Sequence, residues 1–212
     1  MIRGGFDRNR SYAIYDGKIR KAIVIDPFYK AKIYFEKAKE ENFEIAGVLN
    51  THSHRDHTEG NKFFAKKGIF PVDSEGKNEL KIFGMKIKFI RTPGHDEDST
   101  CFLAGGNLFT GDTLFTRRVG MTKTIEDSKV LYESLKKLKK LPDKTRVYPG
   151  HEYAEPFPTT IGEEKKNNPY LKCKNWKEFE SILGKWRGYQ KGSHLKRRFK
   201  YFKYKHFNFK KY

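Results

Sequence analysis

Thr51-His52-Ser53-His54-Arg55-Asp56-His57 is the stretch of this 212-residue chain that decides its fold. Its three histidines and one aspartate follow the pattern H-x-H-x-D-H and come directly after the apolar run 45–49. In an extended turn, imidazoles spaced i and i+2 can reach one cation, while Asp56 and His57 point to a second position. Neutral imidazole and carboxylate oxygen are ligands of borderline metals such as zinc. The stretch therefore predicts a metal site at the end of a strand.

Three further segments place a histidine or an aspartate after an expected strand. They are Thr92-Pro93-Gly94-His95, Gly111-Asp112-Thr113-Leu114-Phe115 and Pro149-Gly150-His151-Glu152-Tyr153. Each segment alone is compatible with a structural polar residue at a strand end. In this order, after the His-rich stretch, they form a strong joint pattern that favours a metal centre.

The rest of the chain alternates expected strands and amphipathic helices. Runs of apolar, β-branched and aromatic residues predict strands at 11–15, 21–25, 45–49 and 145–148. The stretches 80–91 and 100–110 are also rich in strand-forming residues and are broken by Gly84 and by Gly105-Gly106. Apolar residues at helical spacing predict helices at 29–42, 58–67, 127–141 and 175–186. Gly68 and Pro142 end two of these helices, and Asn175 with Glu178 resembles a capping box. Strand pairs and strand–helix units in both halves suggest two sheets with helices outside.

Composition excludes several classes of protein. No stretch approaches the roughly 18 apolar residues that a transmembrane helix needs, and residues 1–5 do not begin a signal peptide. Cys101 and Cys173 are the only cysteines, which excludes a disulfide scaffold and a thiolate zinc site. Such cysteine usage fits a reducing compartment, so we expect a cytoplasmic protein without a membrane span.

The net charge of +19 is unevenly placed, because eleven Lys or Arg and no acid follow Glu180. Residues 185–212 interleave these basic residues with aromatic ones. Cations on phosphates and rings on bases are how proteins hold single-stranded nucleic acid, so this tail is a candidate nucleic-acid contact. The interpretation we favour is a terminal helix or edge strand whose aromatic residues pack on the body. A membrane surface or another partner is the third alternative.

The four segments resemble the metallo-β-lactamase superfamily, and within it the hydroxyacylglutathione hydrolases (glyoxalase II) and their shorter relatives. Residues 158–165 and 168–171 also resemble the end of those shorter proteins, so the resemblance covers about residues 4–172. It implies an α/β (α+β) fold, a four-layer αββα sandwich with the metals at one edge of the two sheets. The expected domains are 1–174 for this fold and 175–212 for a basic, aromatic-rich C-terminal helix and tail.

The resemblance also implies a site for two divalent metal ions, with zinc expected and iron or manganese as alternatives. By position, the implied ligands are His52, His54 and His95 for the first metal, Asp56, His57 and His151 for the second, and Asp112 as a bridge. The implied reaction is hydrolysis of a small-molecule thioester by a hydroxide that the metals share, with Asp56 and Asp112 as the catalytic residues. A thiolate, whose conjugate acid has a pKa near 8.5 by analogy with cysteine, leaves without a side-chain acid.

The substrate residues match the family less well than the metal ligands do. Relatives that bind glutathione use a Lys and a Tyr shortly after the bridging Asp, and those positions fall on Met121 and Lys123. Tyr153 matches the family's Tyr after the last metal-binding His, so Tyr153 and Lys123 are the candidate substrate-binding residues. Residues 96–98, Asp-Glu-Asp, replace the usual small residues. We expect a solvated loop there, the alternative being that its acids disfavour an anionic substrate.

Two other functions share these motifs. The persulfide dioxygenases have similar metal-binding motifs but use one iron, so the metal content of the purified protein distinguishes them from a two-zinc hydrolase. A nucleic-acid-processing metallohydrolase is supported only by the tail, so binding and cleavage of RNA with and without residues 185–212 test it. The acyl and thiol parts of the substrate and the oligomeric state stay open.

Overall fold

The computed structural model describes residues 1–5, 7–28 and 31–183 of the chain. Its N-terminal sheet has the order β1-β2-β3-β4, with bounds Ile2–Gly4, Asn9–Asp16, Lys21–Ile25 and Glu44–Leu49. The first three strands pair antiparallel, whereas β3 and β4 run parallel. A parallel pair needs a crossover, and helix α1 (Lys32–Glu40) provides it.

The second sheet has the order β12-β11-β8-β7-β6-β5. In chain order its strands are β5 (Glu79–Ile82), β6 (Met85–Arg91), β7 (Thr100–Ala104), β8 (Asn107–Gly111), β11 (Arg146–Pro149) and β12 (Thr159–Thr160). Only β8 and β11 pair in parallel, and helix α4 (Ile125–Lys139) lies between them in the sequence. A short ribbon of β9 (Leu114–Phe115) and β10 (Arg118–Val119) precedes α4.

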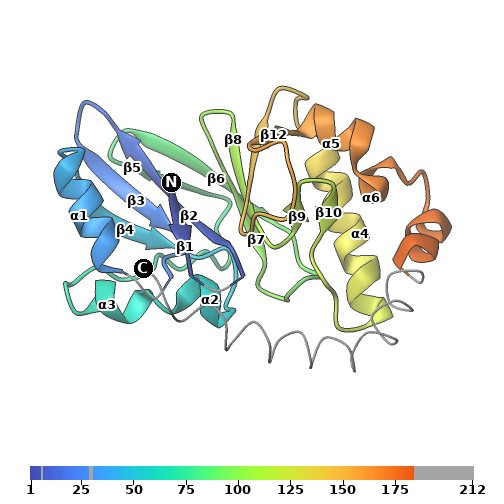
Figure 1. Ribbon diagram of the computed structural model, residues 1–212, viewed down its shortest axis with the longest axis horizontal. Coiled ribbons are helices and arrows are strands. Elements are labelled where there is room, and N and C mark those ends of the chain that lie inside the picture. The colour runs from blue at the N-terminus through green and yellow to red at the C-terminus, as the bar shows by residue number, and fades with distance from the viewer. Residues whose placement is uncertain (6, 29–30, 184–212) are drawn as a thin grey trace, which may run out of the picture. The chain divides into compact units, whose positions relative to one another are not determined.

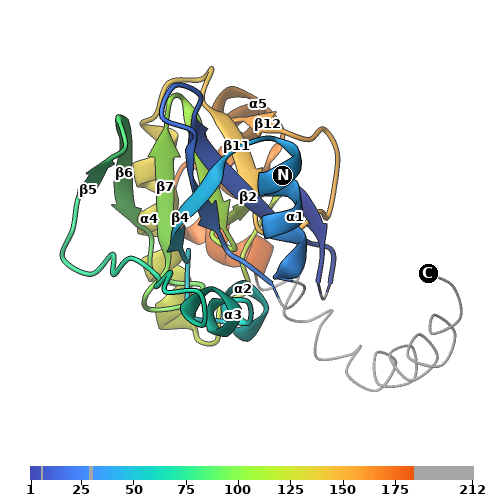
Figure 2. The same ribbon diagram turned by 90° about the vertical axis from the view of Figure 1, so that its left-hand side faces the viewer.

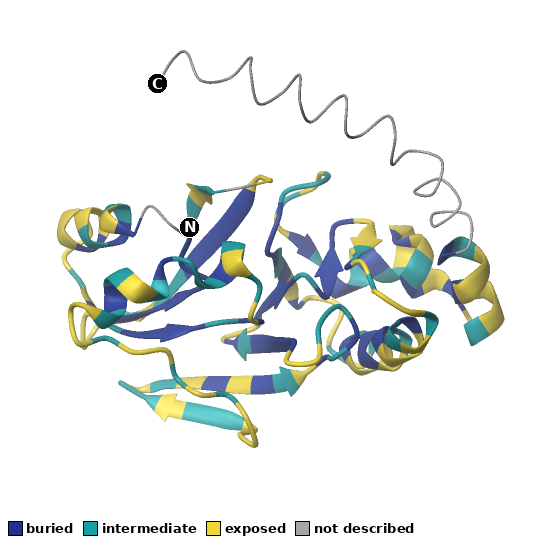
Figure 3. Ribbon diagram, turned by 90° about the horizontal axis from the view of Figure 1, so that it is seen from below, coloured by how far each residue is buried: buried dark blue, intermediate teal, exposed yellow. Residues whose placement is uncertain are grey.

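The two sheets pack face to face through a shared apolar core. Side chains of both sheets form it: Tyr12, Ile23, Ile25 and Leu49 from the first, and Ile87, Phe89, Phe102, Ala104 and Phe109 from the second. These residues alternate with outward-facing ones, because successive side chains of a strand point to opposite faces. Dark blue strands meet at this layer in Figure 3.

Helices cover the outer faces of the sheets. On the first sheet, Val24, Ile45 and Val48 pack against Tyr34 and Ala38 of α1 and against Phe64 of α3 (Asn61–Ala65). On the other side, α4 buries Leu131, Leu135 and Leu138 and packs with α5 (Ile161–Asn167) and α6 (Pro169–Lys172). Figure 1 shows α1 and α3 on one side of the paired sheets and α4, α5 and α6 on the other. Figure 2 shows α1 over the N-terminal sheet, with α2 (Arg55–Thr58) and α3 together below it. The layers are therefore α, β, β, α.

Three expected helices have different bounds in the structure. The helix expected at 58–67 is two short helices, α2 (Arg55–Thr58) and α3, separated at Gly60. A Cβ on Gly60 would lie 2.6 Å from the carbonyl oxygen of Pro27. The backbone at Gly60 therefore lies too close to the backbone at Pro27 for any larger residue. Helix α4 begins two residues before the expected start, because Thr124 caps it through the backbone N–H of Asp127. Helix α1 lies within the expected range 29–42, of which residues 29–30 are not described.

The described residues 173–183 belong to a second unit, separate from residues 1–172. Its described part contains a helix at 176–183, and the backbone N–H of Glu178 donates to Asn175 Oδ1 over 3.1 Å, as the capping-box pattern predicts. The boundary at 174/175 stays a prediction. The basic tail from residue 185 lies outside the described residues. No helix within the described ranges has the length and apolar character that crossing a bilayer requires.

Candidate metal centre

Seven side chains from five segments converge at one edge of the two sheets. The turn after β4 carries His52 and His54, helix α2 carries Asp56 and His57, and the ends of β6, β8 and β11 are followed by His95, Asp112 and His151. Three groups of them place one ligand atom each within 4.8 Å of the others. The groups are His52 with His54 and His95, His52 with His57 and Asp112, and Asp56 with His57 and His151. The structure thus brings together every residue that the sequence predicts as a metal ligand.

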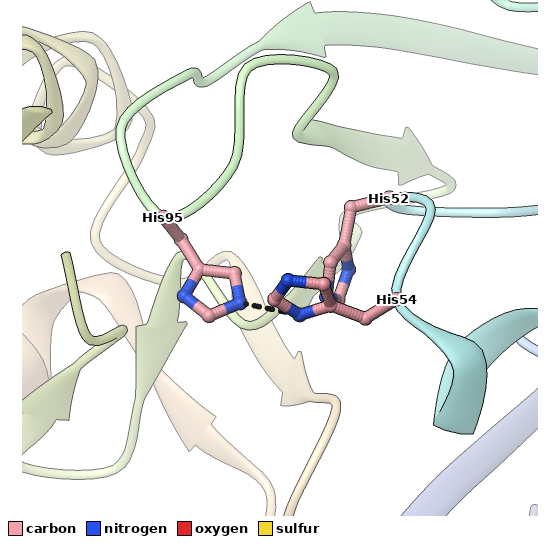
Figure 4. Close-up of side chains that lie close together, drawn as sticks. All are labelled: His52, His54 and His95. Carbon is pink, nitrogen blue, oxygen red and sulfur yellow. Dashed lines mark hydrogen bonds between the residues drawn. The ribbon is translucent and has the colours of Figure 1, made fainter. Parts of the chain in front are cut away.

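The first group has two imidazole nitrogens that face each other. His54 Nδ1 lies 3.1 Å from His95 Nε2 (Figure 4). The other ring nitrogen of His95 donates to the carbonyl oxygen of Met121 over 2.8 Å, and that of His54 lies 2.9 Å from Asp96 Oδ2. With those outer nitrogens protonated, both inner nitrogens carry lone pairs. Two nitrogens bound to one zinc ion lie about 3.4 Å apart, close to the spacing seen here.

The second group repeats this arrangement. His57 Nε2 lies 3.3 Å from His151 Nε2. His57 Nδ1 lies 3.0 Å from Asp26 Oδ2, and His151 Nδ1 lies 2.9 Å from the carbonyl oxygen of Asp7. Asp56 Oδ2 completes the group, 3.4 Å from His151 Nε2. The outer partners again leave the inner nitrogens as acceptors for a shared cation.

Asp112 lies between the two groups. Its Oδ1 is 3.3 Å from His57 Nε2 and 3.4 Å from His151 Nε2, and its Oδ2 is 3.6 Å from His95 Nε2. Each oxygen thus faces a different group, as a bridging carboxylate requires. Gly150 leaves the space for it, because a Cβ there would lie 2.6 Å from Asp112 Oδ1.

The protonation of the cluster fits a site built for cations. Burial lowers the pKa of His52 to about 2, so this imidazole is neutral, the form that binds metal. Burial also lowers the pKa of His151, but contacts with the carboxylates of Asp112 and Asp56 raise it to about 10. A proton therefore occupies this group when no cation does, and a divalent ion would displace it.

Two buried atoms of the cluster support the same conclusion. Within the described residues His52 Nε2 has no hydrogen-bond partner, and Asp112 Oδ1 has only the charged contacts with His57 and His151 given above. A buried polar atom without a partner costs about 1–3 kcal/mol, and a bound metal ion removes that cost. The residues present therefore fit two divalent ions in chemistry and spacing.

Asp26 also belongs to the site, although no sequence pattern indicated it. It follows β3 and is buried, and its Oδ1 accepts the backbone N–H of Thr51 over 2.7 Å. Its Oδ2 accepts the Thr51 hydroxyl over 2.7 Å and faces His57 Nδ1. Asp26 thus fixes both the start of the His-rich turn and the ring of His57. One signal in the sequence could have identified it: Asp26 directly follows an apolar strand. That strand, β3, pairs in parallel with β4, and parallel neighbours end at the same edge of a sheet, so Asp26 lies beside the turn that follows β4.

Replacing Asp26 with alanine is expected to lower zinc affinity about 10–100-fold, because His57 loses the group that orients it. Unfolding free energy should fall by about 1–3 kcal/mol, since the N–H of Thr51 loses its acceptor. Asp26→Asn keeps an oxygen for Thr51 and presents an amide N–H₂ to His57, so it should recover stability more than affinity. Chelator competition and urea unfolding measure the two effects. Wild-type zinc affinity in Asp26→Ala would contradict the orienting role.

The N-terminal segment also reaches the site, which no sequence pattern indicated. Asn9 Nδ2 donates to Asp56 Oδ2 over 3.2 Å, and the backbone of Asn9 forms a bridge with His151. Tyr153, a predicted substrate residue, stacks on His151 with an interplanar angle of 6° and donates its hydroxyl to Asp7 Oδ2 over 2.7 Å. The N-terminal segment and the turn that carries His151 are therefore joined directly.

The second predicted substrate residue lies beside the loop 96–98. Lys123 Nζ is 3.5 Å from Asp96 Oδ1. Glu97 and Asp98 are exposed, as expected for a solvated loop, but Asp96 is partly buried and contacts both Lys123 and His54. The solvated-loop prediction is therefore wrong for Asp96. The reason is that the loop turns back on itself, with the Asp96 N–H donating to Ser99 Oγ, and places the Asp96 carboxylate beside His54.

A cavity of about 560 Å³ adjoins the first group, and its lining includes His52 and Ser53. Its other lining residues include five acids and one arginine: Asp73, Glu75, Asp96, Glu97, Asp98 and Arg91. Arg91 is engaged by the carbonyl oxygens of Glu97 and Asp98. The cavity is therefore acidic in an otherwise basic chain.

Comparison with known proteins gives concordant matches. The family model for the metallo-beta-lactamase superfamily matches residues 4–82 and 70–151. A hydroxyacylglutathione hydrolase of Pelagibacter ubique is 34% identical over 184 residues, which cover 78% of this chain and 76% of that protein. A probable polyketide biosynthesis zinc-dependent hydrolase, BaeB of Bacillus velezensis, is 28% identical and is matched over 81% of this chain and 85% of its own length. The crystal structure of ETHE1 from Myxococcus xanthus superposes with a TM-score of 0.75 at 31% identity, covering 87% of this chain and 90% of that one.

Proposed function

The chain belongs to the metallo-beta-lactamase superfamily, and from this premise we propose that it is a metal-dependent thioester hydrolase of the hydroxyacylglutathione hydrolase type. The observation that carries the proposal is the pair of facing imidazoles in each of two groups, with the Asp112 carboxylate between them. The zinc-dependent hydrolase among the relatives supports zinc as the metal.

We assign His52, His54 and His95 to one ion, Asp56, His57 and His151 to the other, and Asp112 to both. When bound, two such ions lower the pKa of a water molecule and polarise a carbonyl oxygen. The protein's own contribution is orientation. The carbonyl oxygens of Met121 and Asp7 and the carboxylate of Asp26 hold three imidazole rings in the tautomer that directs Nε2 inward.

The remaining steps need little from other side chains. A thiolate leaving group departs without a general acid, because the pKa of its conjugate acid is near 8.5 by analogy with cysteine. Tyr153 lies beside His151 of the second group, and Lys123 lies beside Asp96, which faces His54 of the first group. We propose that they contact the substrate at the two ends of the site. The acids that line the adjoining cavity favour a thiol part with less negative charge than glutathione carries.

Removing the metal is expected to abolish hydrolysis. Purified full-length protein should contain two metal ions per chain and should hydrolyse S-lactoylglutathione or another acyl thioester. Dialysis against a chelator should lower turnover at least about a hundredfold, because the ions contribute several kcal/mol to the transition state. Zinc should restore it.

Two outcomes would decide against this function. One tightly bound iron per chain, with oxygen uptake in the presence of a persulfide, would establish the dioxygenase alternative. A metal-loaded protein that cleaves RNA and no thioester in a broad panel would establish the nucleic-acid alternative.

A further inference from the structure

Each metal-facing imidazole needs an acceptor on its outer nitrogen, and His54 has an unusual one. His95 and His151 use backbone carbonyl oxygens, and His57 uses the buried Asp26. His54 Nε2 instead faces Asp96 Oδ2 at 2.9 Å, a carboxylate on the turn that carries His95. Its side chain is 37% exposed, whereas those of His57, His95 and His151 are exposed by 1%, 10% and 3%. Packing therefore restrains His54 least, and its orientation depends most on this one contact.

Asp96 is itself fixed. The backbone N–H of Glu97 donates to Asp96 Oδ1 over 2.9 Å, and Lys123 Nζ lies 3.5 Å from the same oxygen. The Asp96 N–H donates to Ser99 Oγ over 3.1 Å, and its carbonyl oxygen accepts from Gly94 over 3.2 Å. These contacts occupy Oδ1 and the backbone, so Oδ2 is directed at His54. Since Lys123 is 70% exposed, its ion pair adds little to this arrangement.

We propose that Asp96 is a positioning residue that fixes the tautomer and ring orientation of His54, and thereby tunes the metal group of His52, His54 and His95. By accepting the Nε2–H of His54, the carboxylate leaves the lone pair on Nδ1, the nitrogen that faces His95. It also ties two ligands of one group to each other, because Asp96 follows His95 in the chain. The inference rests on the ligand assignment given under the proposed function.

The test measures zinc binding to the full chain, with zinc alone as the probe. Stepwise competition with a chromophoric chelator resolves the two sites. Asp96→Ala should weaken one site about 10–100-fold and leave the other at its wild-type affinity. Asp96→Asn keeps an oxygen acceptor and should lie between Asp96→Ala and wild type. Asp98→Ala removes an exposed acid of the same loop and serves as the matched control, with both affinities unchanged.

A second readout separates positioning from a general structural role. In zinc-loaded wild type, the Nε2–H proton of His54 should give a slowly exchanging NMR signal, absent in Asp96→Ala and unchanged in Asp98→Ala. Wild-type affinity at both sites in Asp96→Ala would overturn the proposal. Equal weakening of both sites together with a lower unfolding midpoint would overturn it too. A protein that shows the selective loss but hydrolyses no thioester would refute the proposed function and leave this inference intact.

Discussion

Asp112→Ala is expected to lower kcat/KM for thioester hydrolysis by at least about 10³-fold, which corresponds to about 4 kcal/mol of transition-state stabilisation. Its two carboxylate oxygens face different histidine groups, so its loss removes a ligand from both proposed ions at once. It also removes the charge that offsets their positive charge. The fold should persist, because the Asp112 side chain contacts the polar cluster and not the apolar core.

Metal content, circular dichroism and kinetics on the same preparation check this prediction. Asp112→Asn keeps the size of the side chain and one oxygen, so it should retain more metal than Asp112→Ala while staying strongly impaired. Glu36→Ala removes an exposed acid of α1 and should behave as wild type in all three measurements. Near-normal turnover in Asp112→Ala would show that the bridging role is wrong.

Gly94→Ala is expected to destabilise the protein by about 3 kcal/mol or more and to displace His95. Gly94 has a φ of +129°, and a Cβ there would lie 2.4 Å from the backbone nitrogen of Leu131 in α4. Alanine at this φ strains the backbone, and its Cβ would overlap a helix backbone that cannot rotate away. Both effects lower the free energy of unfolding. The turn that carries His95 would have to move away from α4.

Urea unfolding and zinc affinity measure the two consequences of Gly94→Ala separately. Gly17→Ala is the matched control, because a Cβ there meets nothing within 4 Å. Its unfolding free energy should change by no more than about 1 kcal/mol. Equal stability of the two variants would mean that the turn and α4 are not in contact in solution.

Much of the fold could be predicted because its signals are local. The alternating strands, the capping and stop residues and the four polar strand ends all lie within short windows of sequence. The predicted superfamily, the αββα sandwich and the hydrolase class are confirmed by the family model and the relatives. The metal-ligand assignment stays a prediction, although the structure brings all seven side chains together.

The shortest strands could not be predicted, because two residues are too few to show the repeated alternation of polar and apolar side chains that identifies a strand. Strands β9, β10 and β12 have two residues each and are defined by their pairing partners. The division of the expected helix 58–67 at Gly60 depends on the carbonyl of Pro27, which a local pattern does not contain. In each case the tertiary neighbour, and not the residue's own propensity, fixes the backbone.

The residues that orient the proposed ligands could not be predicted from sequence for a related reason. Asp26 contacts a residue 31 positions away, and Asp7 contacts His151 across 144 positions. Asp96 was predicted as solvated because its charge and its neighbours, Glu97 and Asp98, are typical of an exposed loop. Ligands are found by residue type and spacing, whereas their outer partners are set by geometry that only the folded chain provides.

The wide separation in sequence of the residues that meet at the site affects when the site is complete during synthesis. His52, His54, Asp56 and His57 are translated about a hundred residues before His151, which reaches them only when β11 pairs with β8. Domains acquire their structure from the N-terminus during translation, so the nascent sheet holds an incomplete set of the proposed ligands until then. Ions that require the whole set bind last and stabilise only the finished fold. On the ligand assignment proposed above, metal binding would therefore stabilise the last step of folding and not the initial collapse.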